Sequence, residues 1–300
     1  MVAHKHRTHH VASGRFGLGA GINLAFVVAE VAFGITSHSI ALVADAAHNM
    51  GDVLGLLLAW AAATLARRVP SSTHTYGLRK TTLLATLANA VLLLVAIGGV
   101  VWEAVHRLQR SEPVQASVII VVAAVGVLVN GGSALLFMKE RQHDTNVRAA
   151  FTHLVADAAI AVCVVMAGVL VWLTGWQWID PVTSLAVSVA VVAMTWSMLR
   201  DAVGSVVDAV PSHVDYRSVR RYLAELPNVR EVHDLHIWRL SSTETALTAH
   251  LVVPWSACPP DFVQDVCTNL HDRFQIEHST LQLERPDAVD PCVLGPEDKV

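Results

Sequence analysis

Two short stretches of the sequence place ionisable side chains in strongly apolar surroundings. HNMGD at 48–52 and HLVAD at 153–157 both read His-x-x-x-Asp, and each lies in a long apolar segment. Residues four apart share one face of an α-helix, so His48 points the same way as Asp52, and His153 the same way as Asp157. Two imidazoles and two carboxylates make a four-ligand set that suits tetrahedral Zn²⁺. The spacing therefore predicts a metal site that two helices share.

A purely structural cluster of polar side chains is the alternative reading of this pattern. An ionised Asp near the centre of a bilayer costs about 2.5–3.5 kcal/mol and needs compensation. No Lys or Arg lies between residues 41 and 65 or between 151 and 172, so neither segment offers an internal ion pair. Asp45 and Asn23 are predicted to support the ligands, because the free nitrogen of a metal-bound His usually donates to a carboxylate or carbonyl. Helix packing is the alternative role for Asp45.

Composition indicates a membrane protein. Of the 300 residues, 53% are hydrophobic and only 15% are charged, whereas soluble domains carry about 25% charged residues. A span needs about 20 mostly apolar residues. Six segments qualify: 16–36, 40–66, 81–106, 114–138, 149–174 and 180–208. The first has no convincing cleavage site and is expected to be a span rather than a signal peptide. No basic tract indicates nucleic acid.

Loop charges predict the orientation in the membrane. Lys and Arg occur in the N-terminal segment and in the loops after the second and fourth spans, and are absent from the loops after the first and fifth. The positive-inside rule then puts both termini in the cytoplasm, although Arg107 and Arg110 fall on the opposite side. The four cysteines form no C-x-x-C pair, which argues against a disulfide framework and fits a reducing compartment. A bacterial inner membrane suits this chain.

After Pro211 the pattern becomes that of a small soluble domain. An amphipathic helix over 216–226 is followed by alternating strands at 229–240 and 245–253, a helix over 261–274 and a short strand at 279–285. This order predicts an α-β-β-α-β domain, with one sheet and helices on one face. The expected organisation is a His-rich N-terminal tail at 1–15, a transmembrane domain at 16–210, a folded domain at 211–285 and a C-terminal tail at 286–300.

Four sequence motifs resemble one known family. SHSIALVADAAHNMGDVLGL, DTNVRAAFTHLVADA, IDPVTSLAVS and VHDLHIW followed by TAHL occur in this order, and together they resemble the cation diffusion facilitators, the zinc-transporter family, over residues 15–285. The resemblance implies six spans, a ferredoxin-like cytoplasmic domain and a homodimer. It implies metal export in exchange for protons by alternating access. The transport ligands would be His48, Asp52, His153 and Asp157. The two-His form resembles zinc-selective members, with Cd²⁺, Co²⁺ and Ni²⁺ as alternatives.

The resemblance also implies sites outside the membrane. His233, His250 and Glu284 match positions that bind regulatory zinc in relatives, and His278 and Cys292 are candidates to extend that group. Zn²⁺ would then be both the transported substrate and a possible regulatory ligand.

Three further features of the sequence, a strand histidine, a charged pair and an N-terminal histidine cluster, each carry a separate prediction. Strand alternation places His236 on the opposite sheet face from His233 and predicts that it is not a partner. Lys80 and Asp208 match a pair that ties the membrane and cytoplasmic parts together at the dimer interface in relatives. The N-terminal histidines are read either as a metal-capturing tail or as a solvated one; they are His4, His6, His9 and His10.

Chemistry of the ligands predicts the coupling to protons. Zinc binds only neutral imidazole and ionised carboxylate, so binding releases protons and protonation expels the metal. His48 and His153 are the expected proton carriers. A membrane-embedded metalloenzyme is the rival reading, but it needs an open coordination position and a base, and H-E-x-x-H and G-x-S-x-G are absent. A metal sensor without flux is the third reading.

Overall fold

The structure is a computed structural model that describes residues 13–110, 112–138, 145–254 and 259–286. The chain divides into two compact units. One unit contains the chain up to Leu54 together with Val91–Thr195, and the other contains Gly55–Ala90 together with the chain from Trp196 onward. Each unit is described by itself below.

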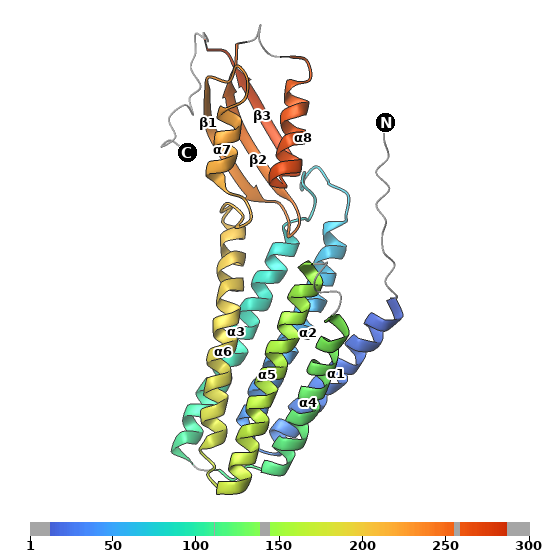
Figure 1. The fold of residues 1–300 in the computed structure, drawn as a ribbon, viewed down its shortest axis with the longest axis vertical. Coiled ribbons are helices and arrows are strands. Elements are labelled where there is room, and N and C mark those ends of the chain that lie inside the picture. Colours follow the sequence, from blue (N-terminus) through green and yellow to red (C-terminus); the bar gives the residue numbers. More distant parts are fainter. Residues whose placement is uncertain (1–12, 111, 139–144, 255–258, 287–300) are drawn as a thin grey trace. The chain divides into compact units, whose positions relative to one another are not determined.

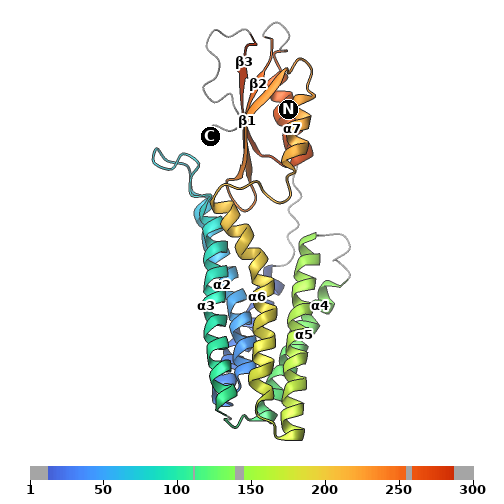
Figure 2. The same ribbon diagram turned by 90° about the vertical axis from the view of Figure 1, so that its left-hand side faces the viewer.

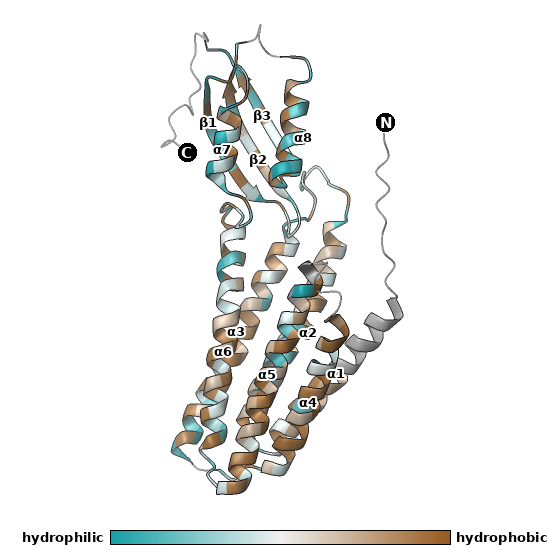
Figure 3. Ribbon diagram, viewed as in Figure 1, coloured by the Kyte–Doolittle hydropathy of each residue, from teal (hydrophilic) through white to brown (hydrophobic). Residues whose placement is uncertain are grey.

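In the described part of the chain, six helices precede the C-terminal domain (Figure 1). They are α1 Ser13–Thr36, α2 Ile40–Ala66, α3 Thr81–Gln109, α4 Ala116–Phe137, α5 Thr145–Thr174 and α6 Ile179–Val206. Within the described residues, α2 to α6 are long and apolar enough to cross a membrane, and Figure 3 shows their apolar composition. In α1 the described side chains begin at Leu24, and Leu24–Thr36 is a shorter apolar stretch. Five predicted spans are therefore confirmed, and the first predicted span, at 16–36, is not.

Small residues let α4 pack closely against α5 and α1. A Cβ atom added at Gly168 of α5 would lie 2.9 Å from Cγ1 of Ile120 on α4, and one added at Gly126 of α4 would lie 3.0 Å from Cζ of Phe26 on α1. Membrane helices associate through such close approaches because lipid tails supply no hydrophobic drive between helices. The apolar core of this unit includes Ile119 and Val164, which are almost fully buried.

One buried carboxylate organises the start of α2. Asp180 of α6 is 1% exposed. Its Oδ2 accepts the backbone N–H of Ile40 at 2.8 Å, and its Oδ1 accepts the hydroxyl of Ser39. The first N–H groups of a helix have no partner within the helix, so Asp180 satisfies the start of α2 from another helix. Arg107 of α3 donates to the backbone carbonyl of His38 in the same turn.

The C-terminal domain has the predicted α-β-β-α-β order. Its elements are α7 Tyr216–Ala224, β1 Glu231–Arg239, β2 Thr245–Val252, α8 Phe262–Phe274 and β3 His278–Glu284. The sheet order is β1-β2-β3, with β1 and β2 antiparallel and β2 and β3 parallel. Helices α7 and α8 cover one face of the sheet (Figures 1 and 2). Leu223, Leu247, Leu251 and Leu270 fill the core between the sheet and these helices.

A bulge in β1 changes which side chains share a face. His233 pairs with His250 and His236 pairs with Thr248, so three steps along β1 correspond to two along β2. Asp234 lies within this irregularity with a φ of 49°. An extra residue of this kind shifts the alternation of side chains by one position. His233 and His236 therefore lie on the same face of the sheet, and the prediction that they face opposite ways is wrong.

The turn between β1 and β2 contacts the start of α3. Arg79, just before α3, donates from Nη1 to Oε2 of Glu244 at 2.7 Å. The backbone N–H of Ser242 donates to the hydroxyl of Thr82 at 3.0 Å. These bonds join the sheet to the first turn of a long apolar helix within one compact unit.

Candidate metal sites

The two His-x-x-x-Asp pairs come together between α2 and α5. His48 and Asp52 lie on α2, and His153 and Asp157 lie on α5. One nitrogen or oxygen atom of each lies within 4.8 Å of the other three. Nε2 of His48 lies 3.1 Å from Oδ1 of Asp157 and 3.8 Å from Oδ2 of Asp52. Nε2 of His153 lies 3.1 Å from Oδ2 of Asp52 and 3.5 Å from Oδ2 of Asp157.

These separations are close to those between the ligands of a zinc ion. Ligand atoms about 2.0 Å from a tetrahedral Zn²⁺ lie about 3.3 Å apart, and the four nitrogen–oxygen contacts run from 3.1 to 3.8 Å, with Asp157 using Oδ1 for one and Oδ2 for the other. The two imidazole rings meet edge to face, with centroids 5.8 Å apart. The group can therefore surround one small divalent cation with little rearrangement.

Burial is uneven across the group. The side chains of His48 and Asp157 are each 4% exposed, whereas Asp52 is 28% and His153 is 40% exposed. Among the ion pairs of the described residues, none joins a Lys or Arg to these four side chains. The site thus has two deeply buried ligands and an accessible side that Asp52 and His153 line.

No hydrogen bond joins Asp45 to Nδ1 of His48 within the described residues, so the predicted support of His48 by Asp45 stays a prediction. Asp45 lies near Glu30 of α1, to which Asn49 donates at 3.0 Å. Nδ1 of His48 is buried and has no hydrogen-bond partner within the described part of the chain. Asp45 faces α1, where another carboxyl group is available, so its contact favours the helix-packing role. The side chain of Asn23 lies outside the described residues.

A second group with metal-ligand chemistry lies in the C-terminal domain. His233 of β1, His250 of β2 and Glu284 of β3 meet on the open face of the sheet, with one ligand atom of each within 4.8 Å of the others. Nδ1 of His250 lies 2.8 Å from Oε1 of Glu284, and Nε2 of His233 lies 3.3 Å from Oε2. The strand pairing brings together three residues that the resemblance grouped by position alone.

Of the two candidates to extend this group, only His278 lies within the described residues, and it is not among the three clustered ligands. His278 begins β3, and its ring packs edge to face against Tyr76, with centroids 5.6 Å apart. Cys292 and the four N-terminal histidines lie outside the described residues.

The predicted Lys80–Asp208 contact is present within one unit. Nζ of Lys80 lies 2.9 Å from Oδ1 of Asp208, and both side chains are 53% exposed. Asp208 follows α6 and Lys80 precedes α3. The contact joins residues that are 128 positions apart in the chain.

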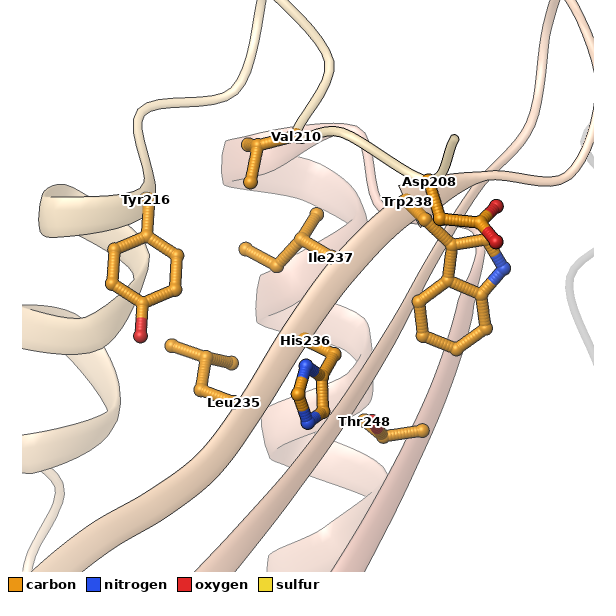
Figure 4. Close-up of a pocket in the computed structure, with 8 residues that line it drawn as sticks. All are labelled: Asp208, Val210, Tyr216, Leu235, His236, Ile237, Trp238 and Thr248. Carbon is orange, nitrogen blue, oxygen red and sulfur yellow. The ribbon is translucent and has the colours of Figure 1, made fainter. Parts of the chain in front are cut away.

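Asp234 and His236 are the residues that the sequence reasoning missed. Oδ1 of Asp234 lies within hydrogen-bond distance of Nε2 of His236, at 2.8 Å. Its Oδ2 lies 3.4 Å from Nε2 of His250. His236 also lines a pocket of about 400 Å³ beside Thr248 (Figure 4). An Asp inside a strand was the available signal, because Asp is depleted in strands and tolerates the left-handed conformation.

These features define a class of protein. Apolar helices long enough to cross a membrane enclose a set of ligands for a divalent cation, and a compact α+β domain follows them. This is the organisation of a membrane carrier for metal ions. Family models support the same conclusion. The model described as the cation efflux transmembrane domain matches residues 18–207, and the model described as the cytoplasmic domain of cation efflux proteins matches residues 211–286.

The chain belongs to the cation efflux family, the cation diffusion facilitators. It is similar to zinc transporter ZitB of Escherichia coli, with 33% identity over 97% of this chain and 93% of the relative. It is similar to the metal cation efflux system protein CzcD of Cupriavidus metallidurans, with 31% identity over 89% of this chain and 84% of the relative. The relatives are transporters, so the chain is a metal cation efflux transporter and not an enzyme.

A solved structure covers only the C-terminal part. The metal-bound C-terminal domain of the CzcD transporter from Cupriavidus metallidurans is 36% identical, and the match covers 24% of this chain and 99% of that domain, with a TM-score of 0.23.

Proposed function

We propose that this protein exports Zn²⁺ from the cytoplasm and that His48, Asp52, His153 and Asp157 bind the ion during transport. The observation that carries this proposal is that each of the four side chains places one nitrogen or oxygen atom within 4.8 Å of the other three. Imidazole suits zinc, whereas sites rich in carboxylates suit harder ions. The names of relatives such as zinc transporter ZitB support zinc as the substrate, with Cd²⁺, Co²⁺ and Ni²⁺ as competing ions.

The same ligands exchange the metal for protons. Zinc requires neutral imidazole and ionised carboxylate, so the loaded site excludes the protons that the empty site accepts. Each imidazole has a carboxylate oxygen 3.1 Å from its Nε2, a contact that stabilises a proton on the ring. His48 and His153 therefore carry the protons that reset the site, and alternating access moves metal outward and protons inward.

Membrane orientation and assembly follow the charge distribution and the family. The loops rich in Lys and Arg face the cytoplasm, so both termini are cytoplasmic, and the membrane is the inner membrane of a bacterium. The chain works as a homodimer embedded in lipid, which the match to the family's cytoplasmic domain supports.

His233, His250 and Glu284 hold a regulatory zinc ion in the cytoplasmic domain. The fit rests on burial and unmet hydrogen bonding. His233 is 5% exposed, and neither of its ring nitrogens has a hydrogen-bond partner within the described residues. Two imidazoles and one carboxylate suit Zn²⁺ and leave one position for water or another ligand. The ion would link the three strands of the sheet.

Zinc uptake into sealed proteoliposomes tests the proposed transport function. The parent protein is expected to accumulate zinc inside vesicles, and Asp157→Ala is expected to reduce the rate at least tenfold, because a buried ligand is lost. Asp201→Ala is the matched control, since Asp201 is exposed on α6 outside the site; its rate is expected to equal that of the parent. Zinc binding by the parent without uptake would reject export and favour a metal sensor.

A further inference from the structure

We propose that Asp234 is a positioning residue for the cytoplasmic metal site, holding His250 in the tautomer that presents Nδ1 to the ion, and that His236 braces Asp234 from the other side. This inference rests on the proposed regulatory zinc site. It concerns residues that the family match and the cluster of three ligands leave without a role.

The two ring nitrogens of His250 face different carboxylates. Nδ1 lies 2.8 Å from Oε1 of Glu284, on the side where His233 also points. Nε2 lies 3.4 Å from Oδ2 of Asp234, on the opposite side of the ring. A metal bound by Glu284 and His233 therefore meets Nδ1 of His250. Nε2 keeps its proton and directs it to Asp234, which fixes the tautomer and the orientation of the ring.

The bulge in β1 is what brings Asp234 to this place. In a regular strand Asp234 would point away from the face that carries His233. The extra residue between His233 and His236, together with the φ of 49° at Asp234, turns its carboxylate back to the open face. Asp is one of the few residues with a side chain that adopt this conformation readily. The backbone irregularity and the carboxylate thus serve the same contact.

His236 completes a continuous row of alternating rings and carboxylates. Its Nε2 lies 2.8 Å from Oδ1 of Asp234, the oxygen that does not face His250. Figure 4 shows His236 beside Thr248, with Leu235 and Ile237 on the side of Tyr216. The His236 side chain is 40% exposed and the Asp234 side chain only 15%, so His236 covers the outer side of the carboxylate. His236 is not among the three side chains whose ligand atoms lie within 4.8 Å of one another, so it is not a ligand in this arrangement.

The proposal is tested by measuring the zinc affinity of the full-length chain in a variant whose transport site is disabled. The measurements use a background protein that carries Asp52→Ala and Asp157→Ala. Zinc binding that is lost when His250→Ala is added to this protein is assigned to the cytoplasmic site. In this background Asp234→Gly is expected to weaken the His250-dependent binding by about 10–100-fold, the usual effect of losing the partner of a metal-bound His. Gly accepts a positive φ without strain, so this change removes the carboxylate and spares the backbone.

Two further variants separate positioning from folding. Asp234→Asn keeps an acceptor oxygen for Nε2 and tolerates the left-handed conformation, so its loss of affinity is expected to be smaller than that of Asp234→Gly. Asp272→Asn is the matched control: Asp272 forms an exposed pair with His271 at 2.9 Å on α8, and its replacement is expected to leave the affinity unchanged.

The spectrum of bound Co²⁺ gives a readout that loss of stability does not change. Asp234→Gly is expected to alter the visible absorption of Co²⁺ in the cytoplasmic site, because the ring of His250 reorients. Parent-like affinity and spectrum in Asp234→Gly would overturn the role of Asp234 and leave the zinc site standing. A larger loss in His236→Ala than in Asp234→Gly would overturn the assigned order, with His236 then a ligand. No His250-dependent binding in the background protein would reject the cytoplasmic zinc site as well.

Discussion

At the scale of single residues, the spacing His-x-x-x-Asp predicts most of the proposed transport site. Helical geometry puts His48 with Asp52 and His153 with Asp157 whatever the helices pack against. Spacing does not reveal which residues pair across the two helices. In the structure the short contacts are the crossed ones, from His48 to Asp157 and from His153 to Asp52, because the rotation of α2 and α5 about their axes depends on packing.

His153→Ala is expected to weaken zinc binding at the transport site by at least about tenfold, or about 1.4 kcal/mol. The change removes one of four ligands and leaves the buried carboxylate of Asp157 with one fewer cationic partner. His106→Ala is the matched control, because His106 lies exposed in the last turn of α3 beside Trp102. Titration calorimetry in a background that lacks His250 measures both. Equal affinity of His153→Ala and His106→Ala would remove His153 from the ligand set.

Two residues show what spacing rules leave out. Asp45 lies one turn from His48, but it also lies near Glu30 of the neighbouring helix α1, a contact that α2 alone does not predict. Strict alternation predicts the wrong sheet face for His236, because the bulge at Asp234 breaks the alternation. Both cases depend on tertiary or backbone features that spacing rules do not contain.

At the scale of elements, the sequence predicts six membrane helices, of which five are confirmed, and the whole α-β-β-α-β order, since long apolar runs and strand alternation are local signals. The predicted helix at 40–66 coincides with α2. Parallel pairing of β2 with β3 follows from the helix between them. The interhelical contacts of Asp180 were not predictable, because they require the start of α2 and the start of α6 to lie together.

Asp180→Ala is expected to lower the free energy of unfolding by about 1–3 kcal/mol, since it leaves the Ile40 N–H and the Ser39 hydroxyl buried without an acceptor. Ser39→Ala removes only the hydroxyl partner and is expected to cost about 1 kcal/mol. Asp201→Ala is the control, because Asp201 is exposed on the same helix. Denaturant unfolding in detergent micelles measures the three variants. If Asp180→Ala were as stable as Asp201→Ala, Asp180 would not be the cap of α2.

At the scale of the whole molecule, composition was enough to predict a membrane protein, and the change near residue 210 was enough to predict a separate folded domain. The pairs Arg79–Glu244 and Lys80–Asp208 join that domain and the end of α6 to the start of α3 within one compact unit. Local patterns do not predict such long-range pairs. Only the resemblance pointed to Lys80 and Asp208.

A double-mutant cycle tests whether Lys80 and Asp208 act as a pair. Lys80→Met, Asp208→Asn and the double variant are expected to lower the free energy of unfolding by similar amounts. The coupling energy is expected to be about 0.2–1 kcal/mol, because both side chains are half exposed and solvent screens them. Asn is chosen because Asp208 has a φ of 59°, which Asn tolerates. Additive effects of the two single changes would show that the contact contributes nothing.

Simultaneous measurement of zinc and proton fluxes in sealed proteoliposomes tests zinc–proton exchange most directly. With a pH gradient that drives protons out of the vesicles, zinc is expected to enter as protons leave, and collapse of the gradient with a protonophore is expected to slow zinc entry. Asp157→Ala is expected to abolish both movements. Zinc entry that continues at the same rate after the gradient is collapsed, with no proton movement, would contradict the exchange mechanism.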